Sequence, residues 1–334
     1  MLEIVFDTEA LTRVRFAISP TIELVASTAV LKDPSRGALH LPWVARARQR
    51  TTGLDISSLR ALQGSDTYNP DFIHPVPTSP LTRFDDELDR MVATPPEQIR
   101  AEVNVAYEGQ AIPAVLDPFL ADPRAAVQDL AGLMRRYWES AIADDWERIR
   151  SLLEHDILYR SRQIADGGTR ALFADLDETV RWDDGVLHID KDCDGHQKFW
   201  GGRLDLDDRG LLLIPSVFAW PKVFMVTAPP WQPALIYPAR GIGMLWESQR
   251  AATPDALARL LGRNRAAVLM ALDCPRSTTE LAGLLGVTSG GISQQLTVLA
   301  EAGLVNRRRV SRHVLYLRTL DGDALVDAVA AAPT

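Results

Sequence analysis

The stretch TTELAGLLGVTSGGISQQLTVLAEAGLVNRRRVSRHVLYL, residues 278–317, decides how the C-terminal part of the chain folds. Ser277, directly before it, and Glu280 form a capping-box pattern that predicts the start of a helix. Gly286 suits the left-handed conformation that ends such a helix, and we expect Val287 to fill the corner beneath the turn. The pattern therefore predicts two short helices joined by a tight turn.

The second of these helices has an apolar side and a small, polar side. Ile292, Leu296 and Leu299 recur at i, i+4 and i+7, so they form one buried stripe. The opposite side carries Gly, Ser, Thr and Gln where an ordinary exposed helix carries Glu and Lys. Gln can make two hydrogen bonds to an adenine edge, and Ser or Thr can meet a base or a phosphate. The residues expected to contact bases are Ser289, Gly290, Ser293, Gln294, Gln295 and Thr297.

Two glycines stand at the start of this second helix, Gly290 and Gly291. Each costs about 1 kcal/mol of helix stability relative to alanine, so a compensating reason is needed. Close approach to a DNA backbone is one such reason. The alternative is that the glycines merely extend the turn and that the helix begins late.

Arginines cluster in the extended run that follows Gly303. Three of them are consecutive and precede a turn, after which residues 313–317 return as a second strand, so the segment is expected to be a β-hairpin. Arginines at a hairpin tip suit contacts to phosphates or to the minor groove. The residues expected to contact the DNA backbone are Thr288, Arg307, Arg308, Arg309 and Arg312.

The net charge of −8 is distributed unevenly along the chain. Between Ala258 and Leu320, nine arginines stand against three acids, a local charge of +6 that leaves −14 for the remainder. A basic module attached to an acidic body is typical of nucleic-acid binding, because phosphate attraction depends on the local field and not on the total charge. A solvated basic face without a partner is the alternative.

The order of helix, ELAGLLGVTSGGISQQL, TVLAEAGLV and arginine-rich hairpin resembles the winged helix-turn-helix of ArsR-type bacterial transcriptional regulators, over roughly residues 254–325. The recognition helix of that family often reads VSxHLxxLxxAGLV, and Gln295 stands where the family often has His. The resemblance implies a homodimer with its recognition helices in the major groove of double-stranded DNA. We expect the protein to recognise a palindromic operator. We also expect it to act as a repressor more than as an activator.

Residues 1–250 are expected to form an effector and dimerisation body, and residues 253–330 the winged helix-turn-helix domain. The segment GLLLIPSVFAWPKVF, residues 210–224, resembles part of the large uncharacterised N-terminal domain that some ArsR-type regulators carry. The fold class is α+β, because the body is mostly helical to residue 165 and rich in antiparallel strands over 180–247. Expected helices cover 20–31, 42–50, 84–93, 96–107, 123–143 and 145–165, and expected strands 186–189, 204–206, 211–214, 223–226 and 234–237.

Catalytic and metal-binding patterns are absent or incomplete, so no enzyme, cofactor or metal is predicted. Cys274 has no second cysteine beside it, and one thiolate cannot build the site of a metal sensor. The stretch HIDKDCDGHQKFWG, residues 188–201, begins like an EF-hand at Asp190, Asp192 and Asp194, but Gly201 stands where the bidentate Glu should be. His188, Cys193 and His196 could instead ligate a transition metal, although a polar hairpin loop explains the same residues.

Five tryptophans fall in the second half of the body. They either fill the core and an interface or line a pocket for a small organic effector that releases the DNA. These residues are Trp182, Trp200, Trp220, Trp231 and Trp246.

The chain shows no signal peptide and no long apolar run, so a cytoplasmic location without membrane contact is expected. The alternative function is a ligand-binding or enzymatic body whose winged helix serves as a protein-interaction or dimerisation module. Arginines clustered on the hairpin favour the DNA-binding hypothesis over this alternative.

Overall fold

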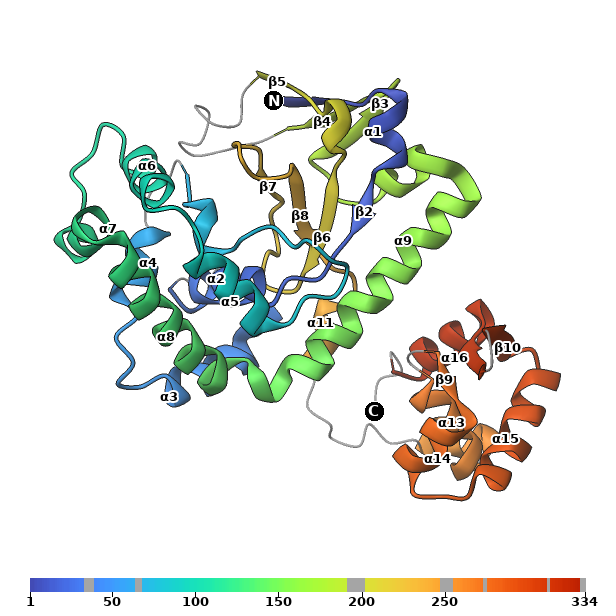
Figure 1. Ribbon diagram of the computed structural model, residues 1–334. Coiled ribbons are helices and arrows are strands. Elements are labelled where there is room, and N and C mark those ends of the chain that lie inside the picture. The colour runs from blue at the N-terminus through green and yellow to red at the C-terminus, as the bar shows by residue number, and fades with distance from the viewer. Residues whose placement is uncertain are drawn as a thin grey trace. The chain divides into compact units, whose positions relative to one another are not determined.

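The computed structural model describes residues 1–32, 39–63, 68–190, 202–246, 255–272, 275–310 and 313–330 (Figure 1). The chain folds as two compact units, Met1–Trp246 and Glu247–Thr334. Both units contain helices and strands, so the predicted α+β class is confirmed. Over the described ranges, every helix is too short or too polar to cross a bilayer.

Two four-stranded sheets form the β part of the first unit (Figure 1). One has the order β3-β4-β1-β5 and the other the order β2-β6-β8-β7. The strands of the first sheet are β1 (Leu2–Val5), β3 (Val180–Asp183), β4 (Val186–Ile189) and β5 (Gly202–Asp205). Those of the second are β2 (Arg15–Phe16), β6 (Leu212–Ser216), β7 (Phe224–Val226) and β8 (Ala234–Pro238).

The expectation of antiparallel strands in this unit is wrong for half of the pairings. β1 pairs parallel to β5, and β2–β6 and β6–β8 are also parallel, whereas β3–β4, β1–β4 and β7–β8 are antiparallel. The physical reason is that β6 and β8 are central strands buried on both faces. Continuous apolar runs such as those of β6 and β8 are typical of parallel strands covered on both sides.

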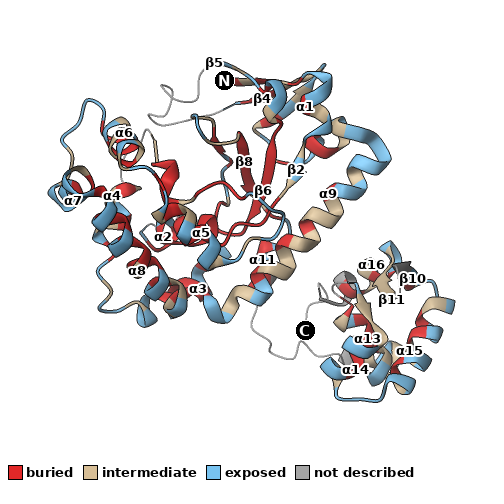
Figure 2. Ribbon diagram, in the orientation of Figure 1, coloured by how far each residue is buried: buried red, intermediate tan, exposed pale blue. Residues whose placement is uncertain are grey.

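The second sheet separates two hydrophobic clusters. Leu213 and Leu235 point to the cluster that contains β1, β3 and β4. Ile214 and Ile236, the next residues along each strand, belong to the cluster on the other face. Figure 2 shows β6 and β8 in the buried colour. Because successive side chains of a strand point to opposite faces, both clusters are filled by one continuous apolar run.

Most helices of the first unit lie between β2 and β3 in the chain (Figure 1), while α1 precedes β2 and α11 follows β8. A short helix α1 (Thr8–Thr12) follows β1, and the Asp7 carboxylate caps it by accepting the amide N–H of Ala10. The others are α2 (Pro20–Lys32), α3 (Leu41–Arg50), α4 (Ser57–Leu62), α5 (Phe84–Val92), α6 (Pro96–Ala106), α7 (Asp117–Ala121), α8 (Pro123–Ala141), α9 (Trp146–Ala174) and α11 (Ile242–Leu245).

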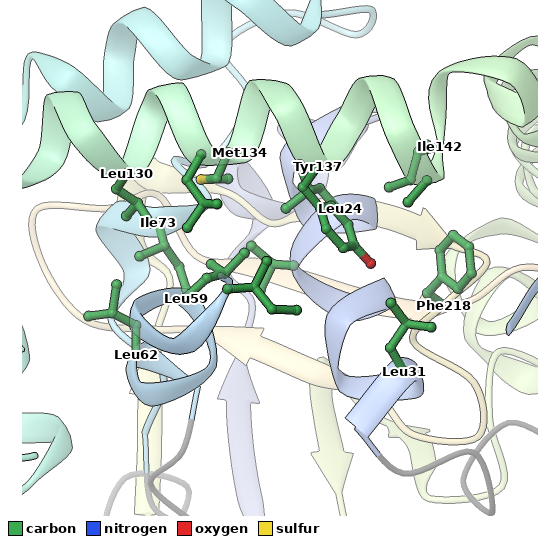
Figure 3. Close-up of a cluster of buried hydrophobic side chains, with 14 of the residues drawn as sticks. Leu24, Leu31, Leu59, Leu62, Ile73, Leu130, Met134, Tyr137, Ile142 and Phe218 are labelled. Carbon is green, nitrogen blue, oxygen red and sulfur yellow. The ribbon is translucent and has the colours of Figure 1, made fainter. Parts of the chain in front are cut away.

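The largest hydrophobic cluster lies between α8 and the helices α2 and α4 (Figure 3). The side chains that α8 contributes to this cluster recur along one side of the helix, as the amphipathic pattern predicts. Tyr137 adds a polar contact inside this core, because its hydroxyl lies 3.0 Å from the Ser27 hydroxyl. The buried residues that Figure 3 labels are Leu24, Leu31, Leu59, Leu62, Ile73, Leu130, Met134, Tyr137, Ile142 and Phe218.

Helix α9 connects this helical part to the β3–β4 hairpin (Figure 1). It runs beyond the predicted end at residue 165, to Ala174, and contains a kink at Gly168, whose φ of 67° is left-handed. The chain resumes a helical course after this glycine. The reason is tertiary, since Leu172 and Phe173 are buried in the cluster that covers β1 and β4.

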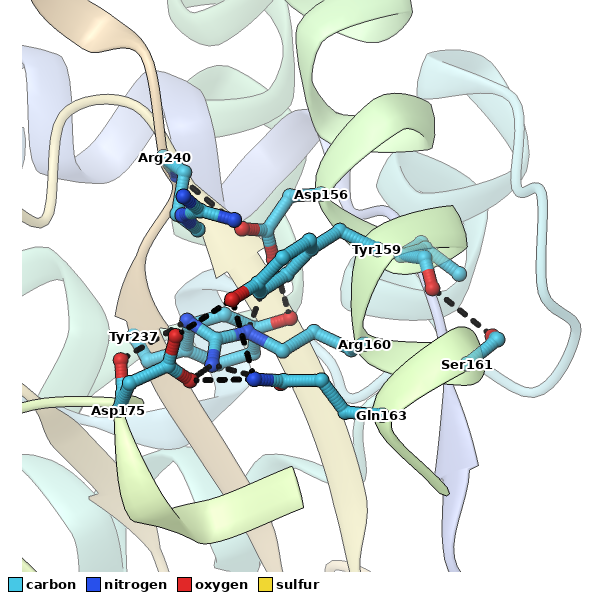
Figure 4. A network of polar contacts seen from close by, with 9 residues as sticks. Asp156, Tyr159, Arg160, Ser161, Gln163, Asp175, Tyr237 and Arg240 are labelled. Carbon is cyan, nitrogen blue, oxygen red and sulfur yellow. Dashed lines mark hydrogen bonds and ion pairs between the residues drawn. The ribbon is translucent and has the colours of Figure 1, made fainter. Parts of the chain in front are cut away.

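A buried polar network joins the middle of α9 to the end of β8 (Figure 4). The Tyr237 hydroxyl donates to Asp156 Oδ2 at 2.7 Å, and the Arg240 backbone N–H donates to Asp156 Oδ1 at 3.1 Å. Arg160, itself only 1% exposed, pairs with Asp156 and with Asp175. The hydrogen bonds from Tyr237 and Arg240 to Asp156 join α9 to the end of β8, and the ion pair with Arg160 compensates the buried charge of Asp156.

Two buried glutamates join helices to neighbouring segments in the same unit. Glu23 of α2 accepts the backbone N–H groups of Val217 and Phe218 at 2.6 and 3.2 Å, just beyond β6. Oε2 of Glu87 in α5 accepts three hydrogen bonds from Ser19 and Thr21, whereas Oε1 is buried and has no hydrogen-bond partner among the described residues. Burial raises the pKa of both carboxyls to about 7.

We expect Glu87→Gln to stabilise the first unit at pH 8 and to flatten its pH dependence. A carboxyl whose pKa rises from 4.5 to about 7 on folding stabilises fully below pH 4.5, and this stabilisation is lost as the pH rises through 7. The loss is on the order of 3 kcal/mol for this group. Gln keeps an oxygen acceptor for Ser19 and Thr21 but carries no charge.

Urea unfolding followed by tryptophan fluorescence between pH 5 and pH 8 measures this change. Glu97→Gln, on the exposed side of α6, is the control and should leave the pH dependence of the wild type unaltered. A Glu87→Gln protein whose free energy of unfolding still falls as steeply as that of the wild type would show that Glu87 is not the group responsible.

Candidate nucleic-acid interface

The second unit is built from five helices and a three-stranded sheet of order β10-β11-β9 within its described residues (Figure 1). Its core consists of the apolar stripes of the helices together with Val305 of the first hairpin strand. The elements are α12 (Asp255–Leu261), α13 (Arg263–Ala271), β9 (Arg276–Ser277), α14 (Thr278–Leu285), α15 (Ser289–Glu301), β10 (Val305–Val310), β11 (His313–Arg318) and α16 (Leu320–Ala330).

Helix α14 starts and ends where the sequence pattern predicts. The Ser277 hydroxyl accepts the N–H of Glu280 at 3.3 Å, and the Glu280 carboxylate accepts the N–H of Ser277 at 2.6 Å, so the capping box is complete. Gly286 ends the helix in the left-handed region, with φ 65° and ψ 29°. An added Cβ at this glycine meets no atom within 4 Å, so the backbone conformation alone requires glycine there.

The corner between α14 and α15 is filled differently from the prediction. Val287 is 49% exposed and does not fill the corner, and Leu284 is 57% exposed. The Val287 N–H donates to the Ala282 carbonyl at 3.1 Å, and its side chain stays on the surface. Leu281 and Ile292, both buried, belong to the core of this unit. The left-handed turn at Gly286 therefore leaves the next side chain outside.

Helix α15 has one buried side and one exposed side. Ile292, Leu296 and Leu299 are at most 1% exposed, as their spacing predicts. All but one of the six residues expected to contact bases are exposed, and Gln295 is half-buried. The exposed five are Ser289, Gly290, Ser293, Gln294 and Thr297.

The glycines do not delay the start of α15, which begins at Ser289. The Thr288 hydroxyl accepts the N–H of Gly291 at 3.2 Å and caps the helix. Gly290 lies inside the helix, and a Cβ added to it meets no atom within 4 Å. Packing within the unit therefore does not require glycine at this position. Thr297 donates its hydroxyl to the Ser293 carbonyl at 2.9 Å, which leaves the lone pairs of that hydroxyl available to a donor.

The arginine-rich strand β10 pairs antiparallel with β11, as the predicted hairpin requires, with Val310 opposite His313. Arg307 pairs with Tyr316 and Arg308 with Leu315, so the two arginines point to opposite faces. Both are exposed. The backbone of Arg309 continues β10, and Arg312 lies outside the described residues.

Other arginines of the unit have structural contacts. Arg318 pairs with Asp323 at 2.8 Å, and its guanidinium also donates to the Leu269 carbonyl at 3.4 Å. Arg276 donates to the Ala271 carbonyl at 2.9 Å. Some of the arginines counted in the +6 charge therefore bind groups of the unit itself. Arg307 and Arg308 supply exposed positive charge beside α15.

The tryptophans expected to line an effector pocket are not gathered at one place. Trp182 packs on Phe6 and Phe173 in the cluster beneath β1. Trp246 donates its indole N–H to His40 Nδ1 at 2.8 Å in the main helical core. Of the other three, Trp220 is half-buried at the edge of that core, Trp231 lines a surface cavity, and Trp200 lies outside the described residues.

The stretch considered for metal binding is described only at its start. His188 of β4 faces Glu3 of β1, with 3.6 Å between Nδ1 and Oε1. Asp192, Cys193, Asp194, His196 and Gly201 lie outside the described residues, as does Cys274. Within the described ranges, no three His, Cys, Asp or Glu side chains are grouped to hold a metal ion.

Comparison with known proteins gives one match. Residues 97–243, from α6 to α11, match a family of unknown function (DUF5937). No curated protein matches the chain, and no solved structure matches it. The match covers the C-terminal three-fifths of the first unit and none of the second.

Two glycine substitutions separate backbone strain from helix propensity in α14. We expect Gly286→Ala to destabilise the second unit by about 1 kcal/mol, because alanine in the left-handed region is strained. Gly283→Ala, in the exposed middle of the same helix, should stabilise it by up to about 1 kcal/mol. Hydrogen exchange of the full-length protein, read on peptides from α14 and α15, measures both changes. Equal protection in the two variants would contradict the left-handed end of α14.

Proposed function

We propose that the chain is a DNA-binding transcriptional regulator whose second unit is a winged helix-turn-helix. The observation that carries this proposal is the exposed side of α15. It offers small and amide side chains directly above a fully buried stripe, and exposed arginines stand on the hairpin that follows. A helix of this kind fits the major groove, where glutamine and serine meet base edges and arginines meet phosphates.

The proposed regulator acts as a homodimer on a palindromic operator and represses transcription. Two α15 helices related by a twofold axis would enter successive major grooves, about 10 base pairs apart. The first unit is larger than dimerisation alone would need, and we propose that it senses a small molecule.

Fluorescence anisotropy with a labelled fragment from upstream of the chain's own coding sequence tests the proposal. Specific binding should exceed binding to a scrambled fragment, and its affinity should fall steeply between 50 and 300 mM KCl, because phosphate contacts release counterions. Equal affinity for both fragments at low salt would refute sequence-specific binding. If Arg307→Glu combined with Arg308→Glu leaves promoter binding intact, the hairpin is instead a protein-interaction module.

Two alanine variants should separate base reading from phosphate contact. Gln294→Ala should cost on the order of 1–3 kcal/mol at one base position and relax specificity there. Arg308→Ala should weaken binding to all sequences alike and lower the salt slope by about one. Arg162→Ala, which removes an exposed charge from α9, is the control and should change neither quantity. Uniform losses in both test variants would contradict the division of roles.

The glycine at the start of α15 gives a test that separates stability from binding. Because an added Cβ at Gly290 meets no atom within 4 Å, Gly290→Ala should stabilise the second unit by up to about 1 kcal/mol. If the backbone approaches DNA closely there, the same methyl group should weaken operator binding. Hydrogen exchange measures the stability of the second unit, and fluorescence anisotropy measures the operator affinity. Unchanged operator affinity would show that the DNA does not approach this position.

A further inference from the structure

A surface cavity of about 360 Å³ lies in the first unit. Its wall combines the loop at residues 76–78, the end of α5, the start of α6 and the loop at residues 230–232. This volume lies in the range of small-molecule sites. The polar side chains that line it include Thr78, Arg90, Thr94, Gln98 and Gln232.

Arg90 supplies the positive charge of this cavity. Its guanidinium is half-buried, and its Nη1 atom is fully buried with no hydrogen-bond partner among the described residues. Burial lowers the pKa of this guanidinium, and attraction by Glu87 opposes that effect. Glu87 is the acid one turn earlier on α5; its Oε2 accepts from Ser19 and Thr21, and its Oε1 makes no hydrogen bond with Arg90 or any other described residue. Arg90 therefore retains hydrogen-bond donors for an external acceptor.

A second acid near the cavity, Glu102, accepts hydrogen bonds from groups of the fold on both carboxylate oxygens. Its Oε1 accepts the Trp231 indole N–H at 3.0 Å and the Gln98 side-chain N–H at 2.8 Å. Its Oε2 accepts the backbone N–H of Phe72 at 2.7 Å. These bonds fix the edge of the Trp231 ring and the amide of Gln98 in the wall. They also mean that Glu102 makes its hydrogen bonds with groups other than Arg90.

The remainder of the wall is apolar. Val76, Pro77, Ala93, Pro95 and Pro230 line it beside the Trp231 ring. A single guanidinium with nearby hydroxyls suits one carboxylate, and a wall of indole and proline rings suits a flat apolar body. A polyphosphate would require more positive charge than one arginine provides.

We propose that this cavity binds a small aromatic monocarboxylate, with its carboxylate on Arg90 and its ring against Trp231. The loop at residues 230–232 leads directly into β8, whose end is bonded to α9 through Tyr237 and Asp156. Trp246, at the end of the same unit, follows through α11. Ligand binding thus acts on the segment that precedes the DNA-binding unit. This regulatory consequence rests on the proposed function, whereas carboxylate binding does not.

Isothermal titration calorimetry on the full-length protein tests the site directly. The probes are benzoate, phenylacetate and indole-3-acetate, each compared with its neutral amide. At least one carboxylate should bind and raise the melting temperature, and its amide should bind at least tenfold more weakly. If no carboxylate binds more tightly than its amide, the proposal is wrong.

Variants then place the bound carboxylate. Arg90→Gln should weaken its binding at least tenfold, and Arg90→Lys, which keeps the charge, should retain part of the affinity. Arg124→Gln is the matched control, because Arg124 lines a second hollow beside the same α5–α6 turn. Loss of binding in Arg124→Gln with full binding in both Arg90 variants would overturn the site. If Arg90→Gln does not fold, Trp231→Ala replaces it as the test variant. Loss of carboxylate binding in Trp231→Ala, together with partial binding in Arg90→Lys, would then support the site, and full binding in Trp231→Ala would contradict it.

The effect on DNA is measured separately, with the probe that binds. A tenfold change in operator affinity corresponds to about 1.4 kcal/mol of coupling between the two sites. A protein that binds the carboxylate but no DNA would refute the proposed function and leave the site standing. A protein that binds its operator but no carboxylate probe would refute the site alone.

Discussion

The burial of β6 and β8 on both faces is the constraint on which the first unit depends. Each strand is an apolar run whose successive side chains fill different clusters, so both faces of the pair require cover. Parallel pairing of these strands also requires the chain to cross from the end of one to the start of the other. That crossing carries β7 and the loop at residues 230–232, so the position of Trp231 follows from the register of the sheet.

Polar groups then fix what covers the sheet. Glu23 joins α2 to the segment after β6, and Asp156 joins α9 to the end of β8. Both carboxyls are buried, and burial raises the pKa of each. Such contacts contribute little net stability when the cost of desolvation is counted, but removing one partner leaves a buried charge without compensation. These buried contacts therefore determine which helices lie against the strands, and they contribute less to the free energy of unfolding.

Most helices and strands could be predicted from local sequence patterns, whereas the pairing of strands far apart in the chain could not. The strand at residues 186–189 and the helix starting at Pro123 lie where alternation and proline at the first helical position place them. β3 was missed because VRWD is a short run with only Val180 buried. The parallel pairings could not be predicted, because strand partners are chosen by the core they share and not by their own sequence.

The same distinction applies to the candidate sites. The side chains of α15 could be assigned to faces from their spacing, because a single helix positions all of them. The cavity at Arg90 could not be predicted, because Arg90 and Trp231 are far apart in the chain and neither belongs to a motif. Concentration of tryptophan suggested an aromatic pocket, but Trp182 and Trp246 pack in separate clusters, and of the described four only Trp231 lines this cavity.

In the proposed regulator, a ligand on Arg90 would change DNA affinity only by binding one conformation of the first unit more tightly than another. The contacts around Trp231 show where such a difference can arise. Its indole is held by Glu102 on α6, whereas the chain on its other side continues into β8. A ring pressed against Trp231 therefore acts on one element that is fixed by a hydrogen bond and on another that is fixed by the sheet. Any displacement of β8 must be accommodated at Asp156, where the sheet and α9 are bonded, before it reaches Trp246. If the proposed ligand binds, this buried carboxylate is accordingly where the first unit would respond to an occupied cavity.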